Sequence, residues 1–159
     1  MLRPMTLEDL SRVLEIERES FSEPWSRSNF EYEILHLDVS ELMVAESDGN
    51  VIGYTVTWFL DEEVHLANIA VRNGFRERGV GKALVLDVMA RAMGEGAAKI
   101  LLEVRESNVE ARKLYESLGF RAVGIRKNYY RKEKEDAILM QCLLQDVTGN
   151  RGPAGGAGL

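Results

Sequence analysis

Apolar residues in the first part of the chain recur three and four positions apart, which is the spacing of one face of a helix. The stripe follows Thr6, which can cap a helix, and contains Leu10, Val13 and Leu14. Glu17 is one polar exception within it. The pattern predicts a first helix that ends at about Ser20.

A second, shorter helix is predicted after the break at Pro24. Ser26 can cap it, and its apolar positions are Phe30, Ile34 and Leu35. The two predicted helices and the loop between them form one N-terminal helical segment.

Strand-like patterns fill the middle of the chain. They cover residues 42–45, 51–60 and 64–71, and Asp48-Gly49-Asn50 is typical of a hairpin turn between the first two. A helix follows, ends at Gly94 and Gly96, and carries the apolar residues Leu84, Val85, Val88, Met89 and Ala92.

The last part of the chain again predicts strands around a helix. Residues 100–104 form a short apolar strand with one acid in it, as a buried parallel strand would. Ser107-Asn108 caps the next helix, whose apolar face contains Ala111, Leu114, Tyr115 and Leu118. Two strands at about 120–130 and 136–145 are joined by the charged run at 132–135. This order predicts an α/β (α+β) fold with a central mixed sheet.

Composition adds bounds on size, partners and location. The 159 residues, 45% of them hydrophobic, suit one domain over residues 1–145, and the Gly-rich residues 146–159 are predicted to be a disordered tail. With 20 basic and 26 acidic residues the net charge is −6, which disfavours nucleic acid and favours a basic peptide or an amine as partner. The lone Cys142 and two isolated histidines predict no disulfide and no metal site. No apolar run approaches the roughly 18 residues of a membrane span, so we expect no membrane partner and a cytoplasmic location.

A turn between a predicted strand and a predicted helix carries the main chemical signal. Backbone N–H groups and a helix N-terminus converge there, which suits an anionic phosphate. Its glycines allow close approach and its cations add charge. The residues are Arg76, Glu77, Arg78, Gly79, Val80, Gly81 and Lys82. By itself the pattern also fits an ordinary strand-to-helix turn.

Two other phosphate motifs fit this turn less well. A dinucleotide-binding motif would need a third glycine where Leu84 stands, although Glu103 lies where a ribose-binding acid could sit. A P-loop would need Lys and then Ser or Thr after Gly79, where Val80 and Gly81 stand.

The turn, one segment before it and two segments after it together resemble the GNAT acetyltransferase superfamily. The turn follows Asn68-Ile69-Ala70-Val71 and precedes Leu102-Glu103-Val104-Arg105-x-Ser107-Asn108 and Leu114-Tyr115-Glu116-Ser117-Leu118-Gly119-Phe120. Together with Arg126-Lys127-Asn128-Tyr129-Tyr130 and Glu135-Asp136-Ala137, these segments resemble the ribosomal-protein alanine N-acetyltransferase branch and the protein N-terminal acetyltransferases of archaea. The likeness covers most of the chain and implies a mixed, mostly antiparallel sheet with about four helices.

The resemblance implies roles for two residues in acetyl transfer. An acid that interrupts an apolar strand can accept a proton from the amine, and by resemblance Glu103 is the expected general base. Its alternative role is a strand-end acid that pairs with an arginine such as Arg105. By resemblance Tyr115 is the expected proton donor to the coenzyme A thiolate, whereas its helical spacing alone favours a core tyrosine.

The same resemblance implies the binding residues. Acetyl-CoA is the expected co-substrate, bound by the turn at 76–82, by the backbone of Ile69, Ala70 and Val71, and by Asn108. Trp25, Tyr129 and Tyr130 are expected to hold the first residues of a substrate peptide, with core packing as the alternative for each.

The expected activity is N-terminal acetylation of a protein, either a ribosomal protein or a range of nascent chains. We expect direct transfer in a ternary complex, since Cys142 lies in a strand pattern far from these motifs, and a monomer or weak oligomer. Acetylation of lysine or of a small amine, or non-catalytic coenzyme A binding, remains open.

Overall fold

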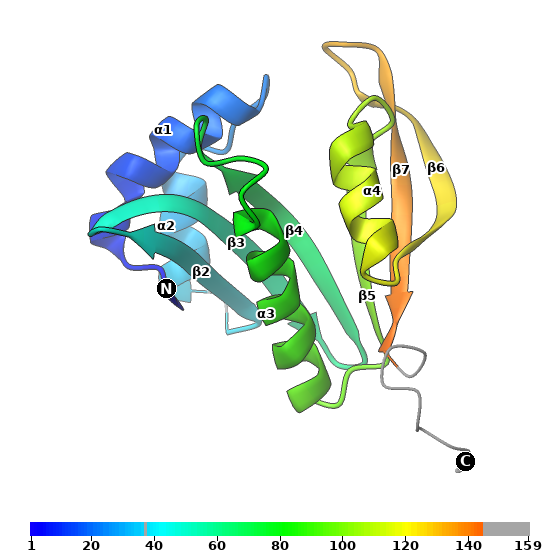
Figure 1. Ribbon diagram of the computed structural model, residues 1–159, viewed down its shortest axis with the longest axis horizontal. Coiled ribbons are helices and arrows are strands. Elements are labelled where there is room, and N and C mark those ends of the chain that lie inside the picture. The colour runs from blue at the N-terminus through cyan, green and yellow to red at the C-terminus, as the bar shows by residue number, and fades with distance from the viewer. Residues whose placement is uncertain (37, 145–159) are drawn as a thin grey trace. The chain divides into compact units, whose positions relative to one another are not determined.

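The computed structural model describes residues 1–36 and 38–144 (Figure 1). They form two compact units. The first contains Met1–Leu60 and Leu66–Ala90, and the second contains Asp61–His65 and the described residues from Arg91 onward. The predicted tail at 146–159 and the end of the last predicted strand lie outside the described residues.

The predicted elements are present, with small changes in their bounds. The first unit contains β1 (Leu2–Pro4), a 3-10 turn (Leu7–Asp9), α1 (Leu10–Ser20), α2 (Arg27–His36), β2 (Ser40–Ser47), β3 (Asn50–Leu60), most of β4 (Glu63–Val71) and most of α3 (Val80–Gly94). The second contains β5 (Lys99–Arg105), α4 (Val109–Ser117), β6 (Arg121–Tyr130) and β7 (Glu135–Leu143). Strand β1 has no counterpart in the prediction, because a three-residue strand carries too little pattern to be detected.

Hydrogen bonds join the strands in the order β1-β2-β3-β4-β5-β7-β6. The β1–β2, β2–β3, β5–β7 and β6–β7 pairs are antiparallel. The β4–β5 pair is parallel and spans Glu63–Lys99 to His65–Leu101. With four α-helices in the described part of the chain, this confirms the predicted mixed, mostly antiparallel sheet.

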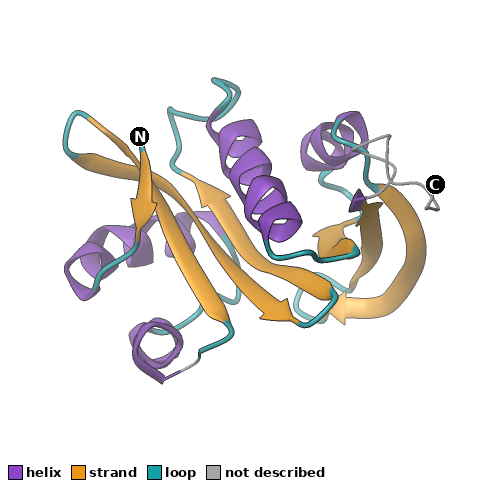
Figure 2. Cartoon of the chain, turned by 90° about the horizontal axis from the view of Figure 1, so that it is seen from below, coloured by secondary structure: helices purple, strands orange, loops and turns teal. Residues whose placement is uncertain are grey.

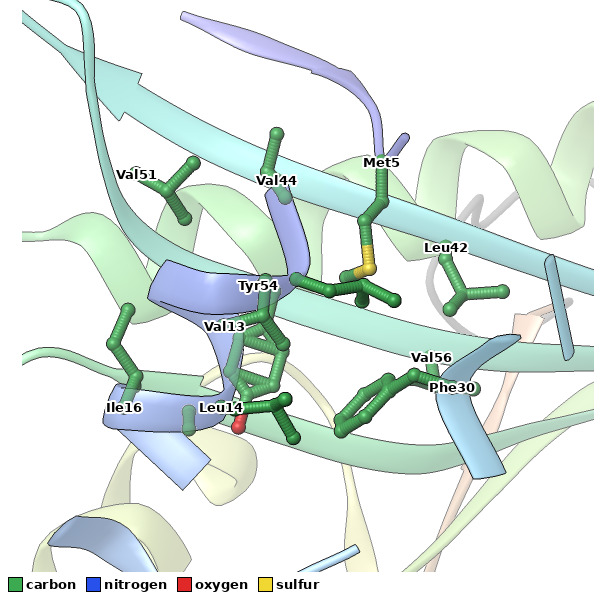
Figure 3. Close-up of a cluster of buried hydrophobic side chains, with 12 residues drawn as sticks. Met5, Val13, Leu14, Ile16, Phe30, Leu42, Val44, Val51, Tyr54 and Val56 are labelled. Carbon is green, nitrogen blue, oxygen red and sulfur yellow. The ribbon is translucent and has the colours of Figure 1, made fainter. Parts of the chain in front are cut away.

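Helices cover both faces of the strands in the first unit (Figure 2). On one face, α1 and α2 pack against β2 and β3 in a core that includes Leu10, Val13, Phe30, Val44 and Tyr54. Figure 3 shows side chains of this core, from α1, α2, β2 and β3, gathered together. On the other face, Leu84 of α3 packs with Ala45 and Ile52. The helical and alternating spacings in the sequence account for both layers, because each puts apolar side chains on one side of its element.

In the second unit α4 lies beside β5, β7 and β6 (Figure 1). The buried side chains of the second unit include Leu102, Val104, Tyr115, Phe120, Ile138, Met140 and Cys142. The charged connection between β6 and β7 spans residues 131–134, so Glu135, which the prediction placed in the turn, begins β7.

Candidate functional site

The predicted anion-binding turn leads into α3. The first intrahelical hydrogen bond of α3 is donated by the Ala83 N–H to Gly79 O at 3.0 Å. The N–H groups of the residues just before Ala83 therefore have no intrahelical acceptor. Glu77 and Gly79 have positive φ values of 62° and 85°. Backbone of this kind turns successive N–H groups toward one point, so the turn can hold an anion.

Gly53 on β3 lets the first turn of α3 come close to the sheet. A Cβ at this position would lie 3.1 Å from Ala70 O, 3.2 Å from Leu84 Cδ1 and 3.3 Å from Val80 Cγ1. These distances are shorter than ordinary van der Waals contact, so a Cβ here would require its neighbours to shift by a few tenths of an ångström. The start of α3 is thereby set against β3 and β4.

Arg76 is exposed and links this turn to β4 and to the end of α1. Its Nε donates to Val71 O at 2.8 Å and its Nη2 donates to Ser20 Oγ at 3.1 Å. Asn73 N–H donates to Glu19 Oε1 at 2.8 Å, which adds a second link to the end of α1. The other two predicted cations of this turn, Arg78 and Lys82, are also exposed. The Arg78 guanidinium lies over the Phe75 ring, 5.4 Å from its centroid.

The predicted cofactor strand shows the alternation of a core strand. Ile69 and Val71 are half-buried and pack with the core near α3, while Ala70 is buried in the core beneath α1 and α2. Asn68, just before them, is buried and donates to Glu17 Oε1 at 2.9 Å.

Trp25 lies in the α1–α2 loop and is partly buried. Its ring centroid is 5.2 Å from that of Phe30, and its backbone N–H donates to Glu17 Oε2 at 2.9 Å. Glu17 also accepts a hydrogen bond from the hydroxyl of Tyr54, whose pKa burial raises. No role was predicted for Glu17 from the sequence, although its place as the polar exception in an apolar stripe was the available signal.

In the second unit, Glu103 lies on β5 with its side chain 26% exposed. Its Oε2 is 2.6 Å from Nε of Arg126 on β6, a residue for which no role was predicted. The alternative partner Arg105 is instead 3.1 Å from Glu133 and 3.4 Å from Glu135. Glu103 thus pairs with an arginine, as its alternative role expected, but the partner is Arg126 rather than the example Arg105, because the β6–β7 hairpin brings other charges to both side chains.

Tyr115 on α4 is buried, with 6% of its surface exposed, and its ring lies 5.7 Å from that of Phe120. Burial raises the pKa of its phenol, and the nearby Tyr130 raises it further. The phenol is therefore protonated at neutral pH.

Tyr130 connects the two predicted catalytic residues electrostatically. Burial raises its pKa to about 12 against the opposing effect of Arg105, and the charge of Glu103 raises it as well. The guanidinium of Arg105 lies 4.1 Å from the centre of the Tyr130 ring. We call Glu103, Tyr115 and Tyr130, which all lie in the second unit, the second-unit cluster.

The remaining two predicted residues lie at the ends of elements in this unit. Asn108 caps α4, as predicted, because its Oδ1 accepts from Ala111 N–H at 3.2 Å. Tyr129 is 47% exposed, and its ring is 5.2 Å from that of Tyr130 and 5.5 Å from the guanidinium of Arg126. The first unit therefore carries Trp25, 69–71 and 76–82, and the second carries the other five predicted residues.

Within the described residues, no group of three or more His, Cys, Asp or Glu side chains is placed to hold a metal ion. In the same part of the chain, no helix is both long and apolar enough to cross a membrane.

Comparison with known proteins gives consistent matches. The model of the acetyltransferase (GNAT) family matches residues 10–120. The [ribosomal protein bS18]-alanine N-acetyltransferase of Haemophilus influenzae is 36% identical over 143 residues, which cover 86% of this chain and 93% of that protein. The crystal structure of the ribosomal-protein-S18-alanine N-acetyltransferase from Escherichia coli has a TM-score of 0.83 at 32% identity, covering 91% of this chain and 93% of that one. The structure of Ard1 from Thermoplasma volcanium has a TM-score of 0.81 at 26% identity, covering 90% and 96%.

Proposed function

The chain belongs to the acetyltransferase (GNAT) family, and we propose that it acetylates the α-amino group of an N-terminal alanine on ribosomal protein bS18. It is an enzyme that uses acetyl-CoA as co-substrate. The substrate proposal is supported by relatives of 32% to 36% identity that carry this activity in their names and match over nearly their whole length.

The observation that carries the chemistry is the second-unit cluster, which combines a carboxylate with a protonated phenol. In our proposal the carboxylate of Glu103 accepts the proton that the attacking amine loses. A free α-amine has a pKa near 8, against about 10.4 for lysine, so a modest base suffices for a protein N-terminus.

Tyr115 supplies the other proton. As the nitrogen bonds to the acetyl carbon and the carbon–sulfur bond breaks, the sulfur gains a proton while the amine loses one. The raised pKa of Tyr115 keeps its phenol protonated, so it can donate a hydrogen bond and then a proton to the departing sulfur. Tyr129 and Tyr130 are proposed to contact the first residues of the substrate.

The first unit supplies the proposed coenzyme-binding groups. Backbone N–H groups of residues 77–82 and the exposed Arg78 and Lys82 would bind the pyrophosphate. The backbone of residues 69–71 would bond the pantetheine arm, and a backbone N–H would polarise the thioester oxygen. Asn108 is also proposed to contact the coenzyme.

We propose direct transfer from acetyl-CoA to the amine, without an acetylated cysteine. Cys142 is fully buried, and its sulfur lies 4.0 Å from Leu118 O. A buried thiol of this kind does not offer an accessible thiolate. We further propose that the enzyme acts in the cytoplasm, where ribosomal proteins are made.

Three peptides test the substrate. One begins with a free alanine, the second has the same sequence with a blocked α-amine, and the third carries an internal lysine. Mass spectrometry should find one acetyl group on the free α-amine alone. Acetylation only of lysine, or only of a small amine, would show that the proposed substrate is wrong.

Two substitutions test the mechanism. Glu103→Gln and Tyr115→Phe should each lower kcat by about 10² to 10⁴-fold, the range for lost general acid or base catalysis, with acetyl-CoA affinity nearly unchanged. Glu116→Gln and Tyr32→Phe, at exposed positions, are matched controls that should leave kcat unchanged. Wild-type turnover in both catalytic variants would show that Glu103 is not the general base and that Tyr115 is not the proton donor.

A further inference from the structure

Glu17 is a buried carboxylate that the proposed chemistry does not use. It lies on α1, only 1% of its surface is exposed, and its neighbours along the stripe, Val13 and Leu14, are core residues. Taking a carboxylate out of water is costly unless donors surround it, and an apolar residue at such a place is often at least as stable. Stability of the fold therefore does not by itself explain an acid here.

The three donors to Glu17 come from three different parts of the first unit. They are the backbone N–H of Trp25 in the α1–α2 loop, the hydroxyl of Tyr54 on β3, and the side-chain amide of Asn68 on β4. Hydrogen bonds to an ionised acceptor are shorter and stronger than neutral ones. One carboxylate thus ties an irregular loop to two strands of the sheet.

The loop end of this network carries a proposed substrate contact. Ser26 caps α2 by accepting a hydrogen bond from the Asn29 N–H at 3.2 Å. Trp25 directly precedes this cap, so Glu17 holds the main chain just before α2 begins. The strands, in contrast, are already fixed by their own pairing and packing. Loss of the Glu17 charge should therefore disturb the loop more than β3 or β4.

We propose that Glu17 is a positioning residue for the protein substrate, because its carboxylate fixes the backbone at Trp25 and so orients the ring that contacts the substrate peptide. The inference rests on the proposed N-terminal acetylation. Glu17 acts through Trp25 rather than through the reacting atoms.

Glu33 offers a matched control in the same unit. It lies on α2, is 8% exposed, and accepts from Ser40 Oγ at 2.6 Å and from Trp58 Nε1 at 2.7 Å. Like Glu17, it is a buried acid on a helix that binds one aromatic donor. Unlike Glu17, it accepts its two bonds from β2 and β3 side chains rather than from the α1–α2 loop.

The test compares Glu17→Gln with Glu33→Gln. Glutamine keeps the shape of the side chain but removes its charge. Its NH₂ group is a hydrogen-bond donor, so it faces another donor at the place where a carboxylate oxygen had accepted a hydrogen bond. For Glu17→Gln we expect the peptide KM to rise roughly tenfold, the effect of weakening a charge-assisted hydrogen bond, with acetyl-CoA affinity unchanged. Glu33→Gln should lower the melting temperature without moving the peptide KM. Hydrogen exchange at the Trp25 amide should become faster only in Glu17→Gln.

The outcomes separate the two proposals. An equal rise in peptide KM in both variants, or a Glu17→Gln variant with wild-type KM and wild-type exchange at Trp25, would overturn the role of Glu17. If the wild-type protein acetylates no N-terminal peptide, the proposed function fails, and exchange at Trp25 still reports whether Glu17 holds the loop. Should Glu17→Gln not fold, Glu17→Asp keeps the charge but shortens the reach, and the same rise in KM is expected.

Discussion

Gly53 gives a direct test of how the fold places the start of α3. In an ordinary strand position, replacing glycine by alanine stabilises a protein by about 0.4 to 1 kcal/mol, because the unfolded chain loses freedom. At Gly53 the new methyl group would meet Ala70 O at 3.1 Å, Leu84 Cδ1 at 3.2 Å and Val80 Cγ1 at 3.3 Å. The first of these neighbours is backbone of β4 and cannot rotate away.

The predicted cost follows from these contacts. Relief requires both Ala70 of β4 and the first turn of α3 to shift by a few tenths of an ångström, and overpacking of this kind costs about 1 to 3 kcal/mol. For a chain of this size that lowers the melting temperature by about 2 to 12 °C. Because the same turn carries the proposed pyrophosphate-binding N–H groups, acetyl-CoA affinity should also fall, by roughly threefold to tenfold.

The assay pairs Gly53→Ala with Gly124→Ala on β6. A Cβ at Gly124 would meet only Leu139, at 3.7 and 3.8 Å, which is ordinary contact. Thermal unfolding and calorimetric titration with acetyl-CoA should show losses for Gly53→Ala and none for Gly124→Ala. A Gly53→Ala protein that melts at or above the wild-type temperature and binds acetyl-CoA normally would refute the close-packing argument.

Two further predictions concern stability alone. Phe30 is fully buried between the rings of Trp25 and Tyr54, so Phe30→Ala should cost about 3 to 5 kcal/mol in urea unfolding, and a loss below about 1 kcal/mol would contradict its place in the core. The Arg3 guanidinium, 2.8 Å away, holds the pKa of the Asp9 carboxyl below its usual value of 3.8. The contribution of this ion pair to the free energy of unfolding is therefore complete above the usual Asp pKa of 3.8. It is lost as the pH falls through the lowered pKa of Asp9 in the folded protein. Unfolding from pH 7 to pH 3 should show Asp9→Asn less stable than wild type at neutral pH, with the gap closing in acid; a gap that does not depend on pH would show that the ion pair is not its cause.

Much of the fold could be predicted because local patterns agree with it. The apolar stripe of α1, the cap at Asn108 and the hairpin turn at Asp48-Gly49-Asn50 are each specified by residues close together in sequence. Strand β1 was missed because its three residues gain their structure from pairing with β2, which no local pattern reveals.

The candidate site divides in the same way. The residue types and their order, from the turn at 76–82 to Glu103 and Tyr115, are enough to indicate acetyl transfer. Which arginine pairs with Glu103 could not be read from the order, because the partner is set by the register of β5, β7 and β6. Strand β7 places Leu139 opposite both Glu103 and Gly124, and Arg126, two residues beyond Gly124, pairs with Glu103 through its side chain.

The sequence by itself thus determined the elements, the fold class and the types of chemical group available, because helical and strand spacings and cap residues act over a few neighbouring positions. Only the tertiary structure decided which groups meet. Glu17 is a polar exception in one helix until β3, β4 and the α1–α2 loop supply its donors, and Gly53 is one more strand residue until α3 packs on it. Both depend on contacts between residues far apart in the chain, and no local pattern encodes those contacts.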